Sequence, residues 1–387
     1  MSRSPVYGRR IHIAGSISTD PAIASAAEVV DAQKFVSGLV RALMRKGANF
    51  VVPVDAEPKR SDGQPICFDW IVWQAIHDAL ALRPGGTPGP LAVGVLHHKT
   101  EEQIPYDRVV LWDALRDGTN VMLENAAQWN MASKRMEAQA RYGDILVTLG
   151  GTEGVIYLAN LYHEAGRPVL PLDLALVGEG EGSRKLNAWG MSSSNSRKLF
   201  QLADGGNPHD WMNRIRFPAR KTVEQRIDTL VELIESLERP SAFAVRLLND
   251  EHEEYAAVQD FFDNVVRPVV EDDLGYRLTV IDGRQAYEHA RVDQEIFAKL
   301  HRSALTIADL TGSRPNCFLE LGYSFGRTLP TVVTARKGFE TPFDITTFAG
   351  HHWKPSGPAD ERRRAFREHI EAVRNRPPLV ESEGLLQ

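Results

Sequence analysis

The feature that most constrains this fold is the alternation of short apolar runs with longer segments of helical periodicity. Strand-like runs occupy residues 10–14, 48–54, 91–96, 144–149 and 168–172, and later 242–247, 277–281, 304–308 and 328–334. Helix-like segments such as 24–46 lie between them. A parallel strand needs a long crossover before its neighbour, so this order is typical of parallel sheets covered by helices. We predict an α/β fold with two Rossmann-like or flavodoxin-like parallel-sheet domains in tandem.

A domain boundary is predicted near Arg239-Pro240-Ser241, where a polar helical stretch ends and a second series of strands begins. A length of 387 residues also favours two domains. We predict a first, nucleotide-binding domain over 1–215, a helical linker over 216–240 and a second domain over 241–387.

Composition excludes several classes of protein. A net charge of −6 gives no electrostatic reason to expect nucleic acid or an anionic membrane as a partner. Cys67 and Cys317 are too few for a disulfide framework or a four-cysteine metal site. The His351-His352 pair is interpreted as loop or surface residues, and no metal is predicted. No apolar run reaches transmembrane length, so we expect a cytoplasmic protein.

Two glycine clusters each follow an apolar run and precede a helix. The first is Gly15-Ser16, and the second comprises Gly150, Gly151, Thr152, Glu153 and Gly154. Glycine allows a ligand to approach the backbone, and the N-terminus of the following helix favours phosphate. The same glycines are also consistent with tight turns required only for packing. Their spacing is neither that of a dinucleotide oxidoreductase nor that of a phosphate-binding loop of nucleoside triphosphatases.

A second polar cluster comprises Asp309, at the end of an apolar run, and Asn316 and Glu320 in the following helix. Asn316 and Glu320 are four residues apart, so they share one helical face. Simple capping, turn formation and solvation remain alternatives for these three residues. Apolar neighbours favour a buried Glu320, which suits a carboxylate that attacks or stabilises an anomeric carbon.

The first domain resembles the SLOG superfamily, which groups Smf/DprA proteins with LOG nucleotide phosphoribohydrolases. The resemblance covers residues 8–175 and rests on Ile13-Ala-Gly-Ser16 and Thr148-Leu-Gly-Gly-Thr-Glu-Gly154. Leu149 replaces the proline of the LOG motif, and Val155, Ile156 and Tyr157 stand where its catalytic glutamate belongs. The resemblance therefore implies nucleotide binding without cleavage, as in the sensor domains of bacterial antiviral proteins.

The second domain resembles the nucleoside 2-deoxyribosyltransferase family over residues 243–334. The matching motif runs from Ala308-Asp-Leu-Thr-Gly to Pro315-Asn and then Glu320-Leu-Gly-Tyr323. The resemblance implies Glu320 as nucleophile, Asp309 as a sugar- or base-binding carboxylate and Asn316 as an orienting group. The other ligand-binding positions that we expect are Arg246, Tyr255, Thr311 and Gly312. Arg246 is equally consistent with a structural salt bridge, and Tyr255 with half-buried packing.

Three functions are consistent with these features. The first is a defence protein that senses a nucleotide signal and uses Glu320 to hydrolyse an N-glycosidic bond of NAD or another nucleotide. The second is a nucleotide-binding regulator that assembles or controls a partner effector without catalysis. The third is a deoxynucleoside salvage transferase or hydrolase. We expect no required cofactor, a nucleotide ligand of the NAD, ADP-ribose or deoxynucleotide type, and a homo-oligomer.

Overall fold

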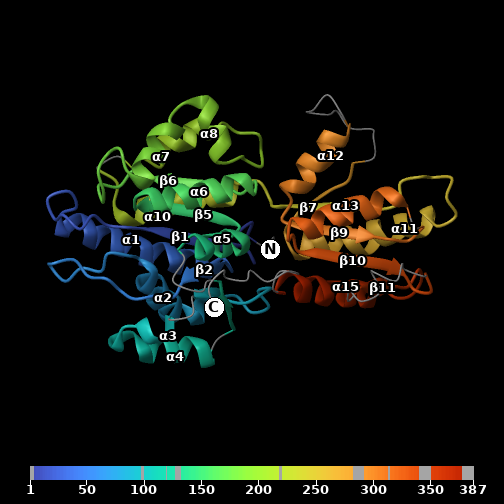
Figure 1. The fold of residues 1–387 in the computed structure, drawn as a ribbon, viewed down its shortest axis with the longest axis horizontal. Coiled ribbons are helices and arrows are strands. Elements are labelled where there is room, and N and C mark those ends of the chain that lie inside the picture. The colour runs from blue at the N-terminus through green and yellow to red at the C-terminus, as the bar shows by residue number, and fades with distance from the viewer. Residues whose placement is uncertain are drawn as a thin grey trace. The chain divides into compact units, whose positions relative to one another are not determined.

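A computed structural model describes residues 4–96, 100–118, 120–126, 132–217, 220–281, 292–312, 314–339 and 350–376. The described chain divides between Glu238 and Arg239 into two compact units, and each has its own parallel sheet (Figure 1). The predicted α/β class with two parallel-sheet domains is confirmed. None of the described helices is both long enough and apolar enough to cross a membrane.

The sheet of the first unit has six parallel strands in the order β4-β3-β2-β1-β5-β6. Their bounds are β1 (Arg10–Ser16), β2 (Asn49–Pro53), β3 (Ala92–Leu96), β4 (Val121–Asn125), β5 (Ile145–Gly150) and β6 (Val169–Leu172). From β1 the chain moves outward through β2 and β3 to β4, and then returns to place β5 on the other side of β1. The strand order therefore reverses between β1 and β5.

The helices of the first unit form two groups. Helices α1 (Ala26–Arg45), α2 (Asp69–Asp78) and α10 (Val223–Ser236) pack together, as do α5 (Ala132–Tyr142), α6 (Glu153–Glu164) and α7 (Gly182–Gly190). Right-handed crossovers in opposite directions from β1 and β5 place α1 and α6 on opposite faces of the sheet. The remaining short helices are α3 (Thr100–Gln103), α4 (Val109–Gly118), α8 (Ser193–Leu199), α9 (Pro208–Arg214), η1 (Leu80–Leu82) and η2 (Tyr106–Arg108).

One strand of the first unit was not predicted from the sequence. The edge strand β4 was not among the predicted runs, because its residues are only partly buried and its hydrophobic pattern is weak. Helix α5 begins at Ala132, and Asn125 ends β4. Helix α10 lies within the predicted linker, 216–240, and its Ile227 and Leu230 belong to the core of the first unit.

The sheet of the second unit has five parallel strands in the order β11-β10-β9-β7-β8. Their bounds are β7 (Ser241–Val245), β8 (Arg277–Thr279), β9 (Leu305–Asp309), β10 (Thr331–Arg336) and β11 (His351–Trp353). Numbered along the chain within the unit, this is the flavodoxin-like order 2-1-3-4-5, and it reverses between β7 and β9. The prediction of His351-His352 as loop or surface residues is wrong for His351, which is partly buried in β11 and stacks on the ring of Phe261.

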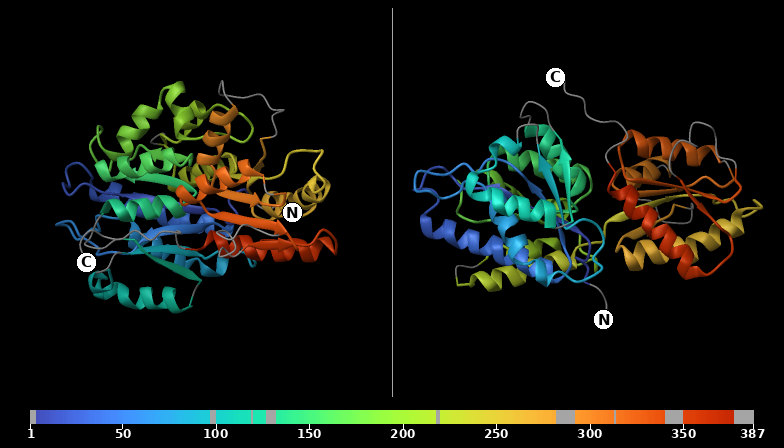
Figure 2. Two further views of the ribbon diagram at one scale, coloured as in Figure 1. Left: turned by 45° about the vertical axis from the view of Figure 1, so that its right-hand side comes forward. Right: turned by 90° about the horizontal axis from the view of Figure 1, so that it is seen from below.

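Side chains of β7 alternate between two hydrophobic layers, as expected for a strand buried on both faces. Ala242 and Ala244 contact the layer formed by α11 (Tyr255–Phe261), the π-helical segments η3 (Phe262–Val266) and η4 (Pro268–Asp273), and α15 (Ala359–Arg374). Phe243 and Val245 contact the layer of α12 (Val292–His301) and α13 (Pro315–Gly326). The second unit is thus also a three-layer α/β sandwich, seen in two further views in Figure 2.

Candidate functional site

The two glycine clusters of the first unit lie side by side where the strand order reverses. In the parallel pairing of β1 with β5, Gly15 is opposite Leu149 and Ser16 is opposite Gly150. The amide of Gly151 donates to the carbonyl oxygen of Ser16 at 2.8 Å. Ligands of open α/β sheets bind beyond the carboxyl ends of the strands at such a reversal. The structure therefore brings all seven predicted residues of these clusters to one edge of the sheet.

Close backbone packing explains several of these glycines. A Cβ atom on Gly15 would lie 1.7 Å from the carbonyl oxygen of Leu149. Gly150 has a φ of +62°, and its Cβ would lie 2.1 Å from the carbonyl oxygen of Ser16. Gly182, at the start of α7, has a φ of +44° and would place a Cβ 2.0 Å from the carbonyl oxygen of Gly151. These three positions require glycine whether or not a ligand binds.

The first turn of α6 leaves amide groups for a ligand. Thr152 is the N-cap residue, and its side chain makes no capping hydrogen bond. Glu153, the first helical residue, is exposed and lies 3.7 Å from the ammonium group of Lys185. Uncapped amides and the positive end of the helix dipole favour an anionic group at this edge.

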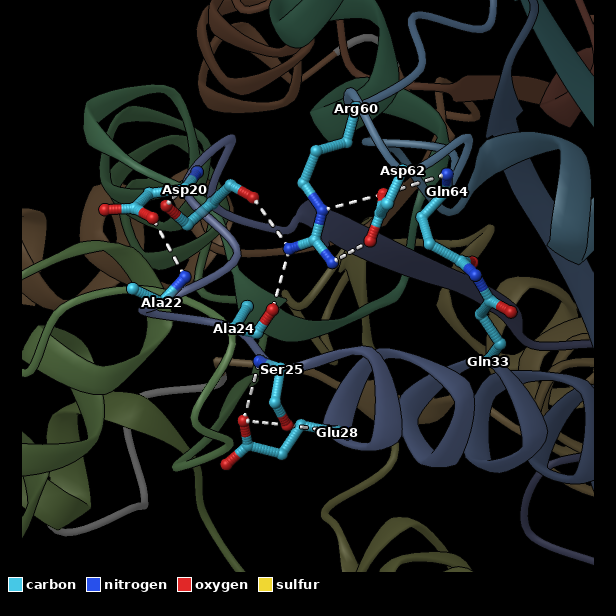
Figure 3. Close-up of polar contacts among 10 residues, drawn as sticks. Asp20, Ala22, Ala24, Ser25, Glu28, Gln33, Arg60, Asp62 and Gln64 are labelled. Atoms are coloured by element: carbon cyan, nitrogen blue, oxygen red, sulfur yellow. Dashed lines mark hydrogen bonds and ion pairs between the residues drawn. The ribbon is translucent and has the colours of Figure 1, made fainter.

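The loop that follows β1 is held by Arg60, a residue that the sequence analysis did not select. Its guanidinium group donates to the carbonyl oxygen of Ala24 at 2.7 Å and to both carboxylate oxygens of Asp62, at 3.0 and 2.5 Å (Figure 3). At the end of the same loop, Ser25 and Glu28 form a capping box that starts α1. Arg60 thereby joins the loop after β1 to the loop after β2. An arginine in an irregular polar loop gives no sequence signal of such a role.

In the second unit, Asp309 is fully buried and its carboxylate oxygens are occupied. Oδ1 accepts the amide of Thr311 at 3.1 Å, and Oδ2 accepts the hydroxyl of Thr334 and the indole N–H of Trp353, both at 2.7 Å. Burial raises the pKa of Asp309, and these hydrogen bonds oppose the shift. In the observed geometry this carboxylate joins β9, β10 and β11.

Glu320 has a different environment. Its side chain is half-buried on α13, and none of the described residues gives it a hydrogen bond or ion pair. Burial raises the pKa of Glu320 to about 7. Asn316, one turn earlier, is exposed. Leu305 and Ile307 of β9 belong to the layer of α11 and α15, so strand alternation directs Asp309 toward that layer and away from α13.

The thiol of Cys317 nevertheless lies within electrostatic range of both carboxylates. Burial, then Glu320 and Asp309, raise the pKa of Cys317 to about 12. The thiol is therefore neutral at physiological pH and is a poor nucleophile.

The other predicted residues of the second unit gather at the reversal between β7 and β9. Gly312 has a φ of +87°, and its Cβ would lie 3.3 Å from the imidazole ring of His252. The hydroxyl of Thr311 accepts the amide of Arg336 at 3.0 Å. The guanidinium carbon of Arg246 lies 5.0 Å from the centre of the Phe262 ring. Tyr255 is partly buried against the core, so the packing alternative describes its observed position.

Within the described residues, no group of three or more histidine, cysteine, aspartate or glutamate side chains has a geometry suited to a metal ion.

Comparison with known proteins assigns a family to the first unit. The sequence profile described as "ATP nucleosidase Cap17-like, N-terminal" matches residues 6–234, more than half of the chain. Two curated relatives, both called ATP nucleosidase Cap17, come from Escherichia coli strain KTE188 and from Escherichia coli. Each is 26% identical over 185 residues, which cover 46% of this chain and 35% of the relative. The chain thus spans about a third of the length of these curated relatives.

Among solved structures, the X-ray structure of TM1055 covers 58% of this chain and 99% of its own, at 16% identity and a TM-score of 0.31. A similarity at that score carries no argument about function. The profile match over residues 6–234 is the finding that assigns the family. Through its first unit, this chain belongs to the family of ATP nucleosidase Cap17-like N-terminal domains.

Proposed function

We propose that this protein is a defence nucleosidase that hydrolyses the N-glycosidic bond of ATP, NAD or a related nucleotide. In this proposal the first unit binds a nucleotide signal and Glu320 of the second unit acts on the glycosidic bond. The observation that carries the proposal is the half-buried carboxyl group of Glu320, without a described partner and with a pKa of about 7. Similarity to proteins named ATP nucleosidase supports this class of reaction.

The proposed reaction depends on the ionised form of Glu320. In its ionised form the carboxylate attacks C1′ of the ribose, and the base leaves with the electrons of the C1′–N bond and takes a proton from water. A second water molecule then hydrolyses the glycosyl ester. Because the nucleophile must be ionised, base release through Glu320 increases as the pH rises through about 7.

We assign binding of the nucleotide signal to the first unit, because its glycine loops and the N-terminus of α6 favour phosphate groups. The loop fixed by Arg60 borders the same edge of the sheet. No glutamate stands in the LOG catalytic position of this unit, which supports binding as the role of its glycine clusters.

A direct test measures free base by chromatography after incubation with ATP, NAD and deoxynucleosides, with and without cyclic dinucleotides. We expect Glu320→Gln to reduce base release by at least 100-fold. Glu368→Gln is the matched control, since Glu368 is an exposed residue of α15 in the same unit. The proposal fails if the wild-type protein releases no base from any of these substrates.

A second candidate function, nucleotide binding without turnover, is favoured by the environment of Asp309. Its carboxylate oxygens already accept three hydrogen bonds from protein groups. As observed, the side chain therefore has a structural role. This alternative predicts saturable nucleotide binding and a change in assembly, with no free base.

A further inference from the structure

The sheet of the first unit has two edge strands, and the fold protects one of them. At β6, Pro171 has no amide hydrogen, and its carbonyl oxygen accepts the side-chain amide of Asn187 on α7 at 2.9 Å. Helix α7 also packs against this strand. A proline and a covering helix both hinder an edge strand from pairing with another chain.

The opposite edge strand, β4, has neither protection. Its sequence, Val121-Met-Leu-Glu-Asn125, contains no proline, lysine or arginine. Among the described strands, β4 pairs only with β3. The side chain of Leu123 is 39% exposed, and Asn125 is exposed as well. An edge of this kind is a template for pairing with another strand.

The hydrogen bonds between β4 and β3 show which backbone groups of β4 are left for a partner. The amide of Ala126 donates to the carbonyl oxygen of Leu96 at 3.1 Å, so the even-numbered residues of this segment bond to β3. A strand has a period of two. The amide and carbonyl groups of Val121, Leu123 and Asn125 therefore point away from the sheet.

The side chains of β4 are held on both faces of the sheet, which fixes the position of this edge. On one face, the carboxylate of Glu124 accepts the hydroxyl of Tyr142 at 2.9 Å. On the other face, Leu123 packs beside Gly94, and a Cβ on Gly94 would lie 3.1 Å from Leu123 and 3.6 Å from Trp112 of α4. The only charged side chain of β4 is thus engaged with α5 and does not block the edge.

Exposed apolar side chains continue from β4 onto the neighbouring helix. Val109 and Val110 of α4 are 38% and 81% exposed, and Tyr106 of the adjoining η2 is 95% exposed. A stable dimer buries about 800 Å² on each partner, which is more than a strand of five residues offers alone. The apolar side chains of α4 and η2 can supply the additional area.

We propose that β4 pairs antiparallel with β4 of a second copy of this chain, about a two-fold axis at Leu123. The pairing joins two six-stranded sheets into one continuous sheet. This inference goes beyond the proposed function and does not depend on it. It gives the homo-oligomer expected from the sequence a specific interface.

The backbone and the charge of β4 determine where the axis lies. With the axis at Leu123, this residue faces its own copy and Val121 faces Asn125, so all three outward residues form hydrogen-bonded pairs. Met122 then faces Glu124. An axis at Met122 or at Glu124 would pair only two of the outward residues. At Glu124 it would also place two like charges directly opposite each other, which is destabilising.

Antiparallel pairing keeps the glycine edges of the two copies apart. The carboxyl ends of the two sheets point in opposite directions, so residues 150–154 of the two copies lie toward opposite sides of the joined sheet. Three strands, β3, β2 and β1, also separate β4 from β5. Variants of β4 should therefore change assembly without changing ATP binding or base release.

Sedimentation velocity of the full-length protein over a range of concentrations tests this interface. We expect the wild type to form a dimer. Leu123→Lys should raise the Kd of the dimer at least about tenfold, because it places two positive charges opposite each other at the axis. Leu82→Lys is the matched control, since Leu82 is a leucine of the same unit with a similar exposure, 36%. The control variant should dimerise like the wild type.

Asn125→Pro is a second variant, which weakens the pairing without adding charge. The amide of Asn125 points away from β3, so proline removes a hydrogen bond to the second copy and none within the sheet. We expect the same increase in Kd, and circular dichroism checks that both variants fold. Hydrogen exchange gives an independent measurement, because the amides of Val121 and Leu123 should exchange slowly in the dimer and rapidly in both variants.

Three results would contradict the proposal. The first is a wild-type protein that stays monomeric at every concentration. The second is a dimer that neither variant weakens, with exchange in residues 121–125 that does not depend on concentration, because another surface then forms the dimer. The third is slow exchange of the outward amides in a monomer, which would show that another segment of the same chain covers β4.

Discussion

At the scale of single residues, the two carboxylates of the Asp309–Glu320 motif differ in what surrounds them. Glu320 has no described partner, and its pKa is raised from 4.5 to about 7 by burial. A raised pKa means that the folded state binds the proton more tightly than the unfolded chain does. The stability that protonation contributes is therefore present below about pH 4.5 and is lost as the pH rises through 7.

This linkage gives a prediction for Glu320→Gln. Glutamine cannot ionise, so the variant should be more stable than the wild type above pH 7, by about 1–3 kcal/mol. Below pH 5 the two proteins should differ little. Urea denaturation at pH 5 and pH 8.5 measures both differences. Equal shifts at the two pH values would show that Glu320 does not titrate near 7.

Asp309 leads to a prediction about Trp353. Trp353→Phe removes the 2.7 Å hydrogen bond to Oδ2 of a fully buried carboxylate. We expect a loss of about 1–3 kcal/mol of stability, measured by urea denaturation. Trp189→Phe is the control, since Trp189 is 44% exposed. A loss no larger than that of the control would mean that the indole contributes little to holding Asp309.

The sequence predicted where these residues lie along the chain, but not their partners. Asp309 was correctly placed at the end of a buried strand. Its partner Trp353 is 44 residues further on, in strand β11. This strand has only three residues, which is too short for its hydrophobic pattern to identify it as a strand. Arg60 was missed for a related reason, because its contact with Ala24 joins two loops that are 36 residues apart along the chain.

At the scale of elements, the close pairing of β1 with β5 leads to a prediction about stability. Gly15→Ala would place a methyl group 1.7 Å from the carbonyl oxygen of Leu149. The central strand pair would have to separate, and we expect at least about 3 kcal/mol of destabilisation or failure to fold. Gly85→Ala is the control, because no atom lies within 4 Å of its added Cβ. Thermal melting of both variants measures the difference, and equal melting temperatures would contradict the observed strand pairing.

Elements with strong hydrophobic patterns were predicted well, and those with weak patterns were not. The central strands β1 and β5 are buried along almost their full length, so they appear in the sequence as continuous apolar runs. The edge strand β4 mixes partly buried and exposed residues, and no alternation distinguishes it from a loop. In the second unit, α11 is followed by two π-helical segments, which sequence periodicity does not reveal.

At the scale of the whole molecule, each unit has its own sheet, its own core and its own strand-order reversal. We treat the two reversals as separate candidate sites for a nucleotide. Binding to one unit stabilises that unit by about 2.7 kcal/mol when the free nucleotide is at 100 times its Kd. The intact protein should therefore show two thermal transitions that respond differently to ligand.

The prediction concerns ATP added to the full-length Glu320→Gln variant, in which turnover at the proposed site is blocked. We expect ATP to raise one transition and to slow amide hydrogen exchange in the loop after β1 and in residues 150–154. Exchange in α15 should not change if the phosphates bind only at the glycine edge. If ATP instead slows exchange only in the second unit, around Thr311 and Gly312, the nucleotide binds at the reversal between β7 and β9. That result would contradict the glycine loops as its binding site. Because exchange reports on individual segments, it assigns the binding unit without any assumption about how the two units are arranged.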